Sequence, residues 1–157
     1  MSIALVTGAS RGIGRACALA LAKRGYDVAV NYGMARSFYE CYGVRSLAVR
    51  ANTAELPEVK DMFRTVVREM GGLDVLVNNA GVVDDRYLMM LTEDSLTRSL
   101  DINIKDYFHC AQQAALKMFK KKSGVIVNIS SVSSVLAIPG QSVYSATKGA
   151  VNALTAT

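Results

Sequence analysis

The chain has 157 residues, of which 51% are hydrophobic and 20% are charged, so it is long enough for one packed domain and too apolar to be disordered. Its apolar runs fall far short of the roughly 18 residues needed to cross a bilayer, and no basic region precedes the first run, so we expect a cytoplasmic protein with no membrane partner. The formal net charge of +5 could favour nucleic acid, but the basic residues are mostly scattered and no nucleic-acid motif accompanies them, so nucleic acid is not an expected partner.

The first third of the sequence predicts a strand, a glycine turn, a helix and two strands. Residues 3–7 form an apolar run without alternation, as expected for a central parallel strand that is covered on both faces. Glycines follow at once, and apolar residues then recur at helical spacing until Gly25, which suits the position just past a helix end. Residues 28–31 and 47–49 are the next two predicted strands.

Two helices and a strand are predicted in the middle of the chain. Pro57 suits the first turn of a helix that Gly71 stops. Residues 75–77 form a fourth strand, and Thr92 can cap a helix that runs to about Leu100. The apolar stripe of the first of these helices consists of Val59, Met62, Phe63, Val66, Val67 and Met70.

The last third predicts a long helix over residues 103–122, a fifth strand over 125–129 and a final helix. That final helical pattern begins at about Tyr144 and is still in progress at Thr157, where the sequence stops. The apolar stripe that defines the long helix consists of Ile104, Phe108, Ala111, Ala115 and Phe119.

Alternating strands and helices predict an α/β fold, a Rossmann-type doubly wound parallel sheet with helices on both faces. We interpret residues 1–157 as a single dinucleotide-binding and catalytic domain. Its last helix lacks a C-cap, a glycine stop and a following strand, and residues 33–45 are barely enough for a parallel crossover. We therefore expect that the C-terminal part of the domain is missing, and that residues within 33–45 are missing or the crossover is reduced.

Cysteine and histidine usage indicates neither a disulfide framework nor a metal site. Cys17, Cys41 and Cys110 are odd in number, widely spaced and in no C-x-x-C arrangement, which fits a reducing cytoplasm. His109 is the only histidine and has no other ligand at metal-binding spacing, so we assign it no role. We expect no bound metal.

The sequence T-G-A-S-R-G-I-G at residues 7–14 places three glycines between the first strand and the first helix. Exposed N–H groups and the helix dipole can hold a pyrophosphate at such a turn. The glycines could instead only permit a tight turn, but the flanking strand and helix are the context that a nucleotide site needs. The candidate cofactor-binding residues of the turn are Gly8, Ser10, Arg11, Gly12, Ile13 and Gly14.

Further candidates follow the fourth and fifth strands. Tyr144 and Lys148 are four residues apart and so lie on one face of the last helix. Ser131 follows the fifth strand, and the N-N-A-G sequence at residues 78–81 follows the fourth. All of these candidates therefore lie at the carboxyl edge of the sheet, where ligands of this fold bind.

These motifs resemble the short-chain dehydrogenase/reductase family over the whole chain, through residues 7–14, through 78–81 and through Y-S-A-T-K at 144–148. Ser131 lies thirteen positions before Tyr144, as the family's catalytic serine does, and Asn103 in D-I-N-I matches its catalytic asparagine. The resemblance thus implies the catalytic set Asn103, Ser131, Tyr144 and Lys148. Asn79, Ala80 and Gly81, together with Tyr144 and Lys148, are added to the expected cofactor contacts.

The implied chemistry is carbonyl reduction. A tyrosine normally ionises near pH 10, and a nearby ammonium and an oxidised nicotinamide would both favour its phenolate, so Tyr144 is the expected general acid and Lys148 tunes it. Ser131 would hydrogen-bond the substrate oxygen, and the resemblance implies that Asn103 holds a water that links Lys148 to solvent. Each residue could instead have an ordinary structural role: Tyr144 at the edge of the core, Lys148 exposed on the surface, Ser131 in a turn and Asn103 as a helix cap.

NADP(H) is the expected cofactor. NAD-preferring folds place an acidic residue after the second strand, but this chain has Asn31-Tyr32-Gly33 there. Arg11 matches the family's 2'-phosphate-binding arginine, and Arg36 could assist. Asn52 stands where the family often has an aspartate, and it could still hydrogen-bond adenine. Tyr32 and Asn52 complete the candidate cofactor residues.

Within the family, residues 85–90 and 140–148 look most like the 3-oxoacyl-[acyl-carrier-protein] reductases, so the expected substrate is a carbonyl compound or a carrier-protein thioester. The lysines at residues 120–122, placed near the active-site edge, could dock an acidic carrier protein, or they could be a solvated helix end. An NADP-dependent dehydrogenase of sugars, polyols or small alcohols stays open, as does a dinucleotide-binding sensor or scaffold. The resemblance also implies a homotetramer, or at least a dimer, paired through the last two helices.

Overall fold

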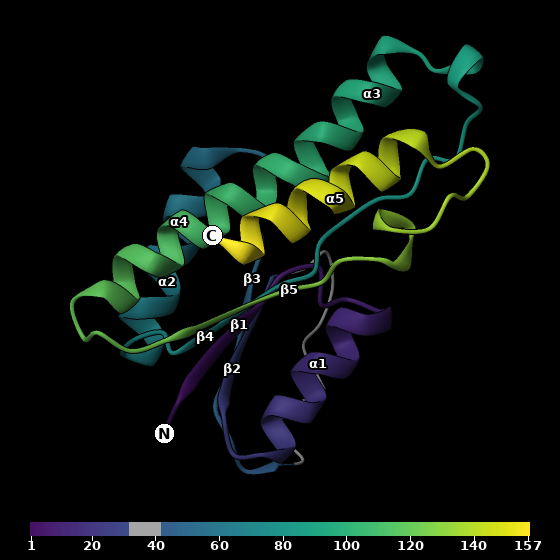
Figure 1. Ribbon diagram of the computed structural model, residues 1–157. Coiled ribbons are helices and arrows are strands. Elements are labelled where there is room, and N and C mark those ends of the chain that lie inside the picture. Colours follow the sequence, from purple (N-terminus) through teal and green to yellow (C-terminus); the bar gives the residue numbers. More distant parts are fainter. Residues whose placement is uncertain (32–41) are drawn as a thin grey trace.

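The computed structural model describes residues 1–31 and 42–157, and its strands form one parallel sheet (Figure 1). The strand order is β3-β2-β1-β4-β5. The sequence thus winds outward from β1 in one direction and then returns to the other side of β1. This reversal makes the carboxyl ends of β1 and β4 the expected ligand crevice. The strands are β1 (Ile3–Val6), β2 (Asp27–Asn31), β3 (Ser46–Val49), β4 (Val75–Asn78) and β5 (Val125–Asn128).

Helices cover both faces of the sheet, as the sequence predicts. Helix α1 (Gly12–Lys23) packs on the face that carries Val6, Val28 and Val77. Helices α2 (Leu56–Met70) and α4 (Asp106–Phe119) pack on the opposite face, around Leu5 and Leu76. The central strands β1, β2 and β4 are therefore buried from two sides, which explains why they are apolar runs without alternation, whereas the edge strands β3 and β5 each expose one face.

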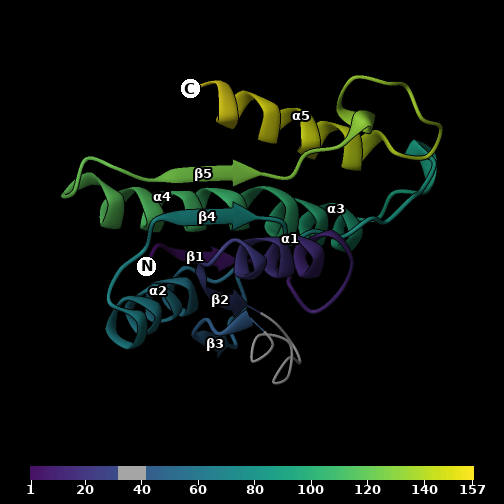
Figure 2. The same ribbon diagram turned by 90° about the horizontal axis from the view of Figure 1, so that it is seen from below.

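The remaining helices lie toward the β5 edge. Figure 2 shows the strands side by side, with α5 (Ser142–Ala156) lying beyond β5 and next to α3 (Glu93–Leu100). The Thr92 hydroxyl caps α3 by accepting a hydrogen bond from the Ser95 backbone N–H at 3.2 Å, as the sequence predicts. Helix α5 begins two residues before Tyr144, at Ser142.

One expectation about the long helix is wrong. Its start is not at Asn103, because the π-helical turn Asp101–Lys105 joins α3 to α4 in one continuous helical column (Figure 1). No glycine or proline interrupts the sequence there, so the helix has no reason to stop. Two of the apolar residues that define the helix in the sequence are exposed: Phe108 is 51% exposed and Phe119 is 82% exposed. The buried face instead carries Asn103, Asp106, Tyr107, Cys110, Gln113, Ala114 and Met118.

Candidate active site

The turn after β1 and the loop after β4 bind each other at the carboxyl edge of the sheet. The buried Thr7 hydroxyl accepts hydrogen bonds from the backbone N–H groups of Asn79 at 3.0 Å and Ala80 at 3.1 Å. The Asn79 side-chain amide donates to the carbonyl oxygens of Thr7 at 2.9 Å and Gly8 at 3.2 Å. Asn79 therefore positions the glycine turn. Thr7 is a site residue missing from the sequence-based candidates, although it opens the glycine motif.

Two glycines allow this close approach. A Cβ atom at Gly8, whose φ is +60°, would lie 2.9 Å from the Cα of Ala80. A Cβ atom at Gly14 would lie 2.3 Å from Nδ2 of Asn79 and 2.6 Å from the Gly8 carbonyl oxygen. No side chain fits at Gly8 unless the loop after β4 moves, and none fits at Gly14 unless the glycine turn itself also moves. The turn consequently remains thin enough for a ligand to approach its backbone.

The first turn of α1 presents its N–H groups outward. Arg11 occupies the N-cap in an extended conformation, no side chain caps the helix, and the first turn holds no acidic residue. Ser10, Arg11, Gly12 and Ile13 are exposed, whereas Gly14 is buried. The positive end of the helix dipole therefore points to a solvent-facing position next to the crevice between β1 and β4, which is how dinucleotide folds bind an anion.

The far end of the expected cofactor site is formed by the residues after β2 and β3. Asn31 is buried, and its amide donates to the carbonyl oxygens of Val49 at 3.4 Å and Ala51 at 3.0 Å, which ties the two strand ends together. Asn52 is exposed just beyond β3, and its Oδ1 accepts from the Ala54 N–H at 3.2 Å. The predicted contacts Tyr32 and Arg36 lie outside the described residues.

Lys148 is the buried cation of the site. It is 3% exposed, and its Nζ donates to the Tyr107 hydroxyl at 3.0 Å and to the Ile129 carbonyl at 2.8 Å. Nζ also lies 5.9 Å from the centre of the Tyr144 ring, so the two predicted partners do lie together. Burial lowers the pKa of Lys148 to about 8, although the Asp106 carboxyl opposes this change. The ammonium is thus less stable than that of a solvated lysine.

Asn103 ties the loop after β4 to the last helix. It is buried in the π-helical turn, its Oδ1 accepts from the Val82 N–H at 2.8 Å, and its Nδ2 donates to the Val82 carbonyl at 2.9 Å. A Cβ atom at Gly81 would lie 3.3 Å from Oδ1 of Asn103 and 3.8 Å from Nζ of Lys148. The predicted site residues Gly81, Asn103 and Lys148 therefore lie close together, although they come from the loop after β4, the π-helical turn and α5. Short π-helical turns are often found at functional sites.

Ser131 begins a chain of hydrogen bonds that leads away from β5. Its Oγ donates to Oγ of Ser133 at 3.1 Å, and Ser133 donates to Oε1 of Gln141 at 2.7 Å. The Gln141 amide then donates to Oδ2 of Asp85 at 3.1 Å. The half-buried Tyr144 follows three residues after Gln141 on α5. These hydrogen bonds connect the predicted catalytic serine to the loop after β4.

Two buried ionisable residues of the site were not predicted. Burial raises the pKa of Asp106 to about 7, while the Thr53 hydroxyl, Cys110 and the Lys148 charge oppose the rise. Burial also raises the pKa of Tyr107, with the Asp106 charge adding to the effect. Both residues follow Asn103 by about one helical turn, and that spacing is the signal that could have revealed them.

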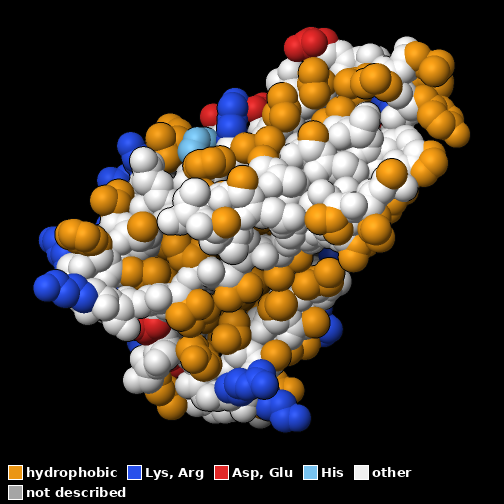
Figure 3. Space-filling model, in the orientation of Figure 1, with side chains coloured by type: hydrophobic (Ala, Val, Ile, Leu, Met, Phe, Trp, Pro, Cys, Tyr) orange, Lys and Arg blue, Asp and Glu red, His pale blue; other side chains and the backbone are white. Residues whose placement is uncertain are grey.

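An open apolar groove adjoins α5. Its volume is about 580 Å³, and its walls are residues 86–89 after β4 and the loop before α5. A hydrogen bond from the Arg86 N–H to the Gly140 carbonyl at 2.8 Å joins the two walls. Leu88, Met89 and Leu136 are each more than half exposed along it, and Ser145, next to Tyr144, forms part of its lining. Figure 3 shows hydrophobic side chains gathered at this end of the molecule.

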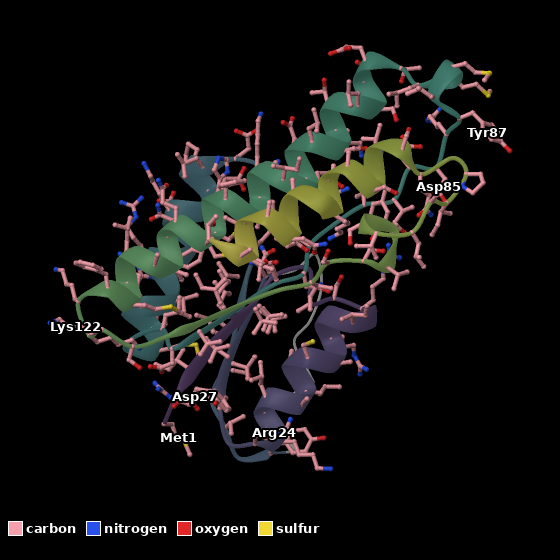
Figure 4. The ribbon with its side chains drawn as sticks, in the orientation of Figure 1. Met1, Arg24, Asp27, Asp85, Tyr87 and Lys122 are labelled. Atoms are coloured by element: carbon pink, nitrogen blue, oxygen red, sulfur yellow. The ribbon has the colours of Figure 1, made fainter. Side chains whose placement is uncertain are left out.

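The lysines at residues 120–122 do not lie where a carrier protein would need them. Lys121 donates to the Leu73 carbonyl at 2.5 Å and pairs with Asp74, just before β4. Figure 4 shows Lys122 at the same end of the molecule as Met1, with Asp85 and Tyr87 at the far end. The lysines therefore lie at the amino edge of the sheet, and the expectation that they lie near the active-site edge is wrong, because α4 runs antiparallel to the strands.

Across residues 1–31 and 42–157, no group of three or more His, Cys, Asp or Glu side chains is arranged to hold a metal ion. Likewise, none of the helices in these two segments is long and apolar enough to cross a membrane.

Comparison with known proteins identifies relatives of this chain. It is 48% identical over 159 residues to the 3-oxoacyl-[acyl-carrier-protein] reductase FabG of Staphylococcus aureus strain Mu50, covering 97% of the chain and 65% of the relative. It is 40% identical over 162 residues to the 3-oxoacyl-[acyl-carrier-protein] reductase of a Synechocystis species, covering 99% of the chain and 66% of the relative. The chain thus spans about two thirds of the length of these relatives.

Solved structures show the same fold. A Sinorhizobium meliloti 1021 protein assigned to the short-chain alcohol dehydrogenases superposes with a TM-score of 0.94 at 36% identity, covering 98% of this chain and 64% of that one. A doubly substituted mutant of a Serratia marcescens short-chain dehydrogenase/reductase gives a TM-score of 0.89 at 32% identity, covering 98% of this chain and 65% of that one. The family model for short chain dehydrogenases matches residues 2–157. The chain therefore belongs to the short-chain dehydrogenase family.

Proposed function

We propose that the protein reduces a carbonyl group to an alcohol with NADPH, and that residues 1–157 carry its cofactor site and catalytic set in one domain. The observation that carries this proposal is the position of Lys148. Its buried ammonium lies beside Tyr144 and Asn103, next to the crevice where the sheet reverses its strand order. A buried cation is costly, and its placement against a tyrosine is typical of a site that needs a perturbed phenol.

The residues present fit a dinucleotide. The positions of Gly8 and Gly14 admit no Cβ, and the uncapped first turn of α1 can bind the pyrophosphate through the N–H groups of Gly12 and Ile13. We assign the 2'-phosphate to Arg11, which is exposed at the N-cap. When bound, the nicotinamide supplies the hydride for the reaction.

We assign each catalytic residue one task. Tyr144 donates a proton from its hydroxyl to the substrate oxygen, and Lys148 holds a positive charge nearby that favours loss of that proton. Ser131 turns its hydroxyl from Ser133 to the same substrate oxygen and donates a hydrogen bond to it as negative charge develops there. The Asn103 side chain is already bonded to Val82, so it holds the loop after β4 in place. We assign to Asn103 as well the water expected from the family resemblance, which would link Lys148 to solvent.

A 3-oxoacyl thioester of acyl carrier protein is the substrate class that we propose. The apolar walls of the groove that Ser145 helps to line support it, because an acyl chain gains free energy from such walls whereas a sugar or polyol needs hydrogen-bonding side chains. The names of the two curated relatives point the same way.

Comparing substrates tests this choice. Purified full-length protein should oxidise NADPH with an acetoacetyl thioester and much more slowly with matched small ketones and keto sugars. Faster turnover of the sugars or small ketones would instead favour a polyol or alcohol dehydrogenase. NADPH binding without turnover of any of them would indicate a sensor or scaffold.

Cofactor preference is tested by Arg11→Ala. Losing a charged hydrogen bond costs about 1.5 to 3 kcal/mol, so we expect NADPH to bind about 10- to 150-fold more weakly and NADH to change little. Isothermal titration calorimetry measures both affinities. Arg24→Ala is the matched control, because Arg24 is an exposed arginine at the other end of α1 (Figure 4). Equal losses for the two cofactors would mean that Arg11 only shapes the turn.

We also propose that the protein is a homotetramer, or at least a dimer, and works in the cytoplasm. Apolar side chains on the outer face of α4 support the assembly: Phe108, Leu116 and Phe119 are 51%, 59% and 82% exposed. Free Cys17 and Cys110 support a reducing compartment.

A further inference from the structure

We propose that Tyr107 is a positioning residue for Lys148, holding the lysine ammonium beneath Tyr144 through a direct hydrogen bond from Nζ to its hydroxyl. This inference rests on the proposed function, since it assigns a reason for the placement of a catalytic lysine. Tyr107 is fully buried on α4, four residues after Asn103, and its side chain spans from that helix to the end of β5.

Three polar groups form a closed triangle at the base of the site. The Tyr107 hydroxyl donates to the Ile129 carbonyl at 2.8 Å, and Lys148 Nζ donates to the same carbonyl at 2.8 Å. Nζ also donates to the Tyr107 hydroxyl at 3.0 Å. The Tyr107 proton is thus committed to Ile129, which leaves its oxygen lone pairs free to accept from the lysine.

An ammonium has three N–H donors, and this triangle uses two of them. The ammonium itself lies 5.9 Å from the centre of the Tyr144 ring. The face of the Tyr107 ring adds attraction, because Nζ lies 4.8 Å from the ring centre. Tyr107 therefore holds the Lys148 ammonium in place through both its hydroxyl and its ring.

Tyr107 suits this task because it stays neutral. Burial raises its pKa, so it keeps its proton throughout the working range and cannot compete with Tyr144 as the acid. The other titratable groups facing Lys148 in the described structure are Asp106 on α4 and Tyr144 on α5 itself. Asp106 acts through its charge, whereas Tyr107 touches the ammonium.

The test is Tyr107→Phe in the full-length protein, a change that removes one oxygen and keeps the ring. Because burial already lowers the pKa of Lys148, losing one of two acceptors should lower it further. We expect kcat for carbonyl reduction to fall about tenfold at pH 8, and the basic limb of the kcat/KM profile to move down by about one pH unit, with the substrate KM little changed. Tyr26→Phe, at a half-buried tyrosine against α1, should leave the profile unchanged.

A lysine-selective NMR titration of the ammonium group makes the test independent of turnover. The Lys148 resonance should titrate at lower pH in Tyr107→Phe than in the wild type. An unchanged Lys148 titration with a lowered melting temperature would overturn the proposal and leave a purely structural hydroxyl. If Tyr107→Phe does not fold, site-specific 3-fluorotyrosine at residue 107 keeps the hydroxyl but weakens it as an acceptor, and should shift the titration in the same direction by less.

The two proposals fail in distinguishable ways. Absence of turnover in the wild type for every carbonyl compound would contradict the proposed function, while the NMR titration would still decide the role of Tyr107. Normal turnover with an unchanged pH profile and an unchanged lysine titration in Tyr107→Phe would contradict only the positioning role.

Discussion

Tyr144→Phe in the full-length protein should lower carbonyl turnover by about 10²- to 10⁴-fold, the range for loss of a general acid, and leave NADPH affinity nearly unchanged. The substitution removes only the hydroxyl that would protonate the substrate oxygen. The glycine turn that we assign to the pyrophosphate lies on other elements, between β1 and α1, so most of the cofactor contacts stay intact.

Single-turnover kinetics with NADPH and an acetoacetyl thioester measure the effect of Tyr144→Phe on the chemical step. Tyr26→Phe serves as the control for loss of a tyrosine hydroxyl elsewhere in the domain and should keep wild-type turnover. A Tyr144→Phe protein that turns over at the wild-type rate would remove Tyr144 from the mechanism.

Gly14→Ala should nearly abolish cofactor binding and lower the melting temperature. The added Cβ would lie 2.3 Å from Nδ2 of Asn79, 2.6 Å from the Gly8 carbonyl oxygen and 3.1 Å from the Cα of Ala9. Two of these three atoms belong to the glycine turn itself, so relief of the clash would distort the backbone that we expect to bind pyrophosphate. Overpacking of this kind costs about 1 to 3 kcal/mol, and loss of the turn geometry should weaken NADPH binding by at least about 100-fold.

Gly149→Ala provides the matched control for Gly14→Ala. Gly149 lies within α5, and a Cβ there would meet no atom within 4 Å. Alanine is the better helix former, so this variant should be as stable as the wild type or more stable by up to about 1 kcal/mol. Thermal unfolding and NADPH titration of both variants give the comparison. Wild-type NADPH affinity in Gly14→Ala would show that the turn tolerates a side chain and would weaken its assignment as the cofactor site.

The fold and the proximity of Tyr144 to Lys148 could be predicted because their signals are local in the sequence. Apolar runs bounded by glycines give the strands, and the confirmed doubly wound sheet then brings every strand-end motif to one edge. The spacing of Tyr144 and Lys148 places both on one face of α5, and Nζ of Lys148 does lie 5.9 Å from the Tyr144 ring.

The buried face of α4 could not be read from hydrophobicity. Phe108 and Phe119 define the apolar stripe in the sequence, yet both are exposed, while the buried face contains Asp106 and Gln113. Burial of polar side chains is tolerated only where partners satisfy them. For Tyr107 those partners are Ile129 and Lys148, 22 and 41 positions away in the chain, so only the fold identifies them.

The position of the lysines at residues 120–122 depends on the direction of α4, and the role of Asn79 depends on its hydrogen bonds. The lysines at residues 120–122 are at the amino edge because α4 runs back along the sheet before β5 begins. Asn79 stays a predicted cofactor contact from the N-N-A-G sequence, and the structure adds that its amide binds the Thr7 and Gly8 carbonyls and so shapes the turn. Motif spacing locates such residues and does not assign their partners.

Isotope transfer tests the central claim most directly. The full-length protein should convert an acetoacetyl thioester and NADPH deuterated at the transferable C4 position of the nicotinamide into a 3-hydroxyacyl thioester. Mass spectrometry should find one deuterium on the carbinol carbon for each NADPH consumed, and Tyr144→Phe should form this product about 10²- to 10⁴-fold more slowly, as expected for loss of a general acid. Tight binding of NADPH with no deuterium in the product of any carbonyl compound would contradict the proposed hydride transfer.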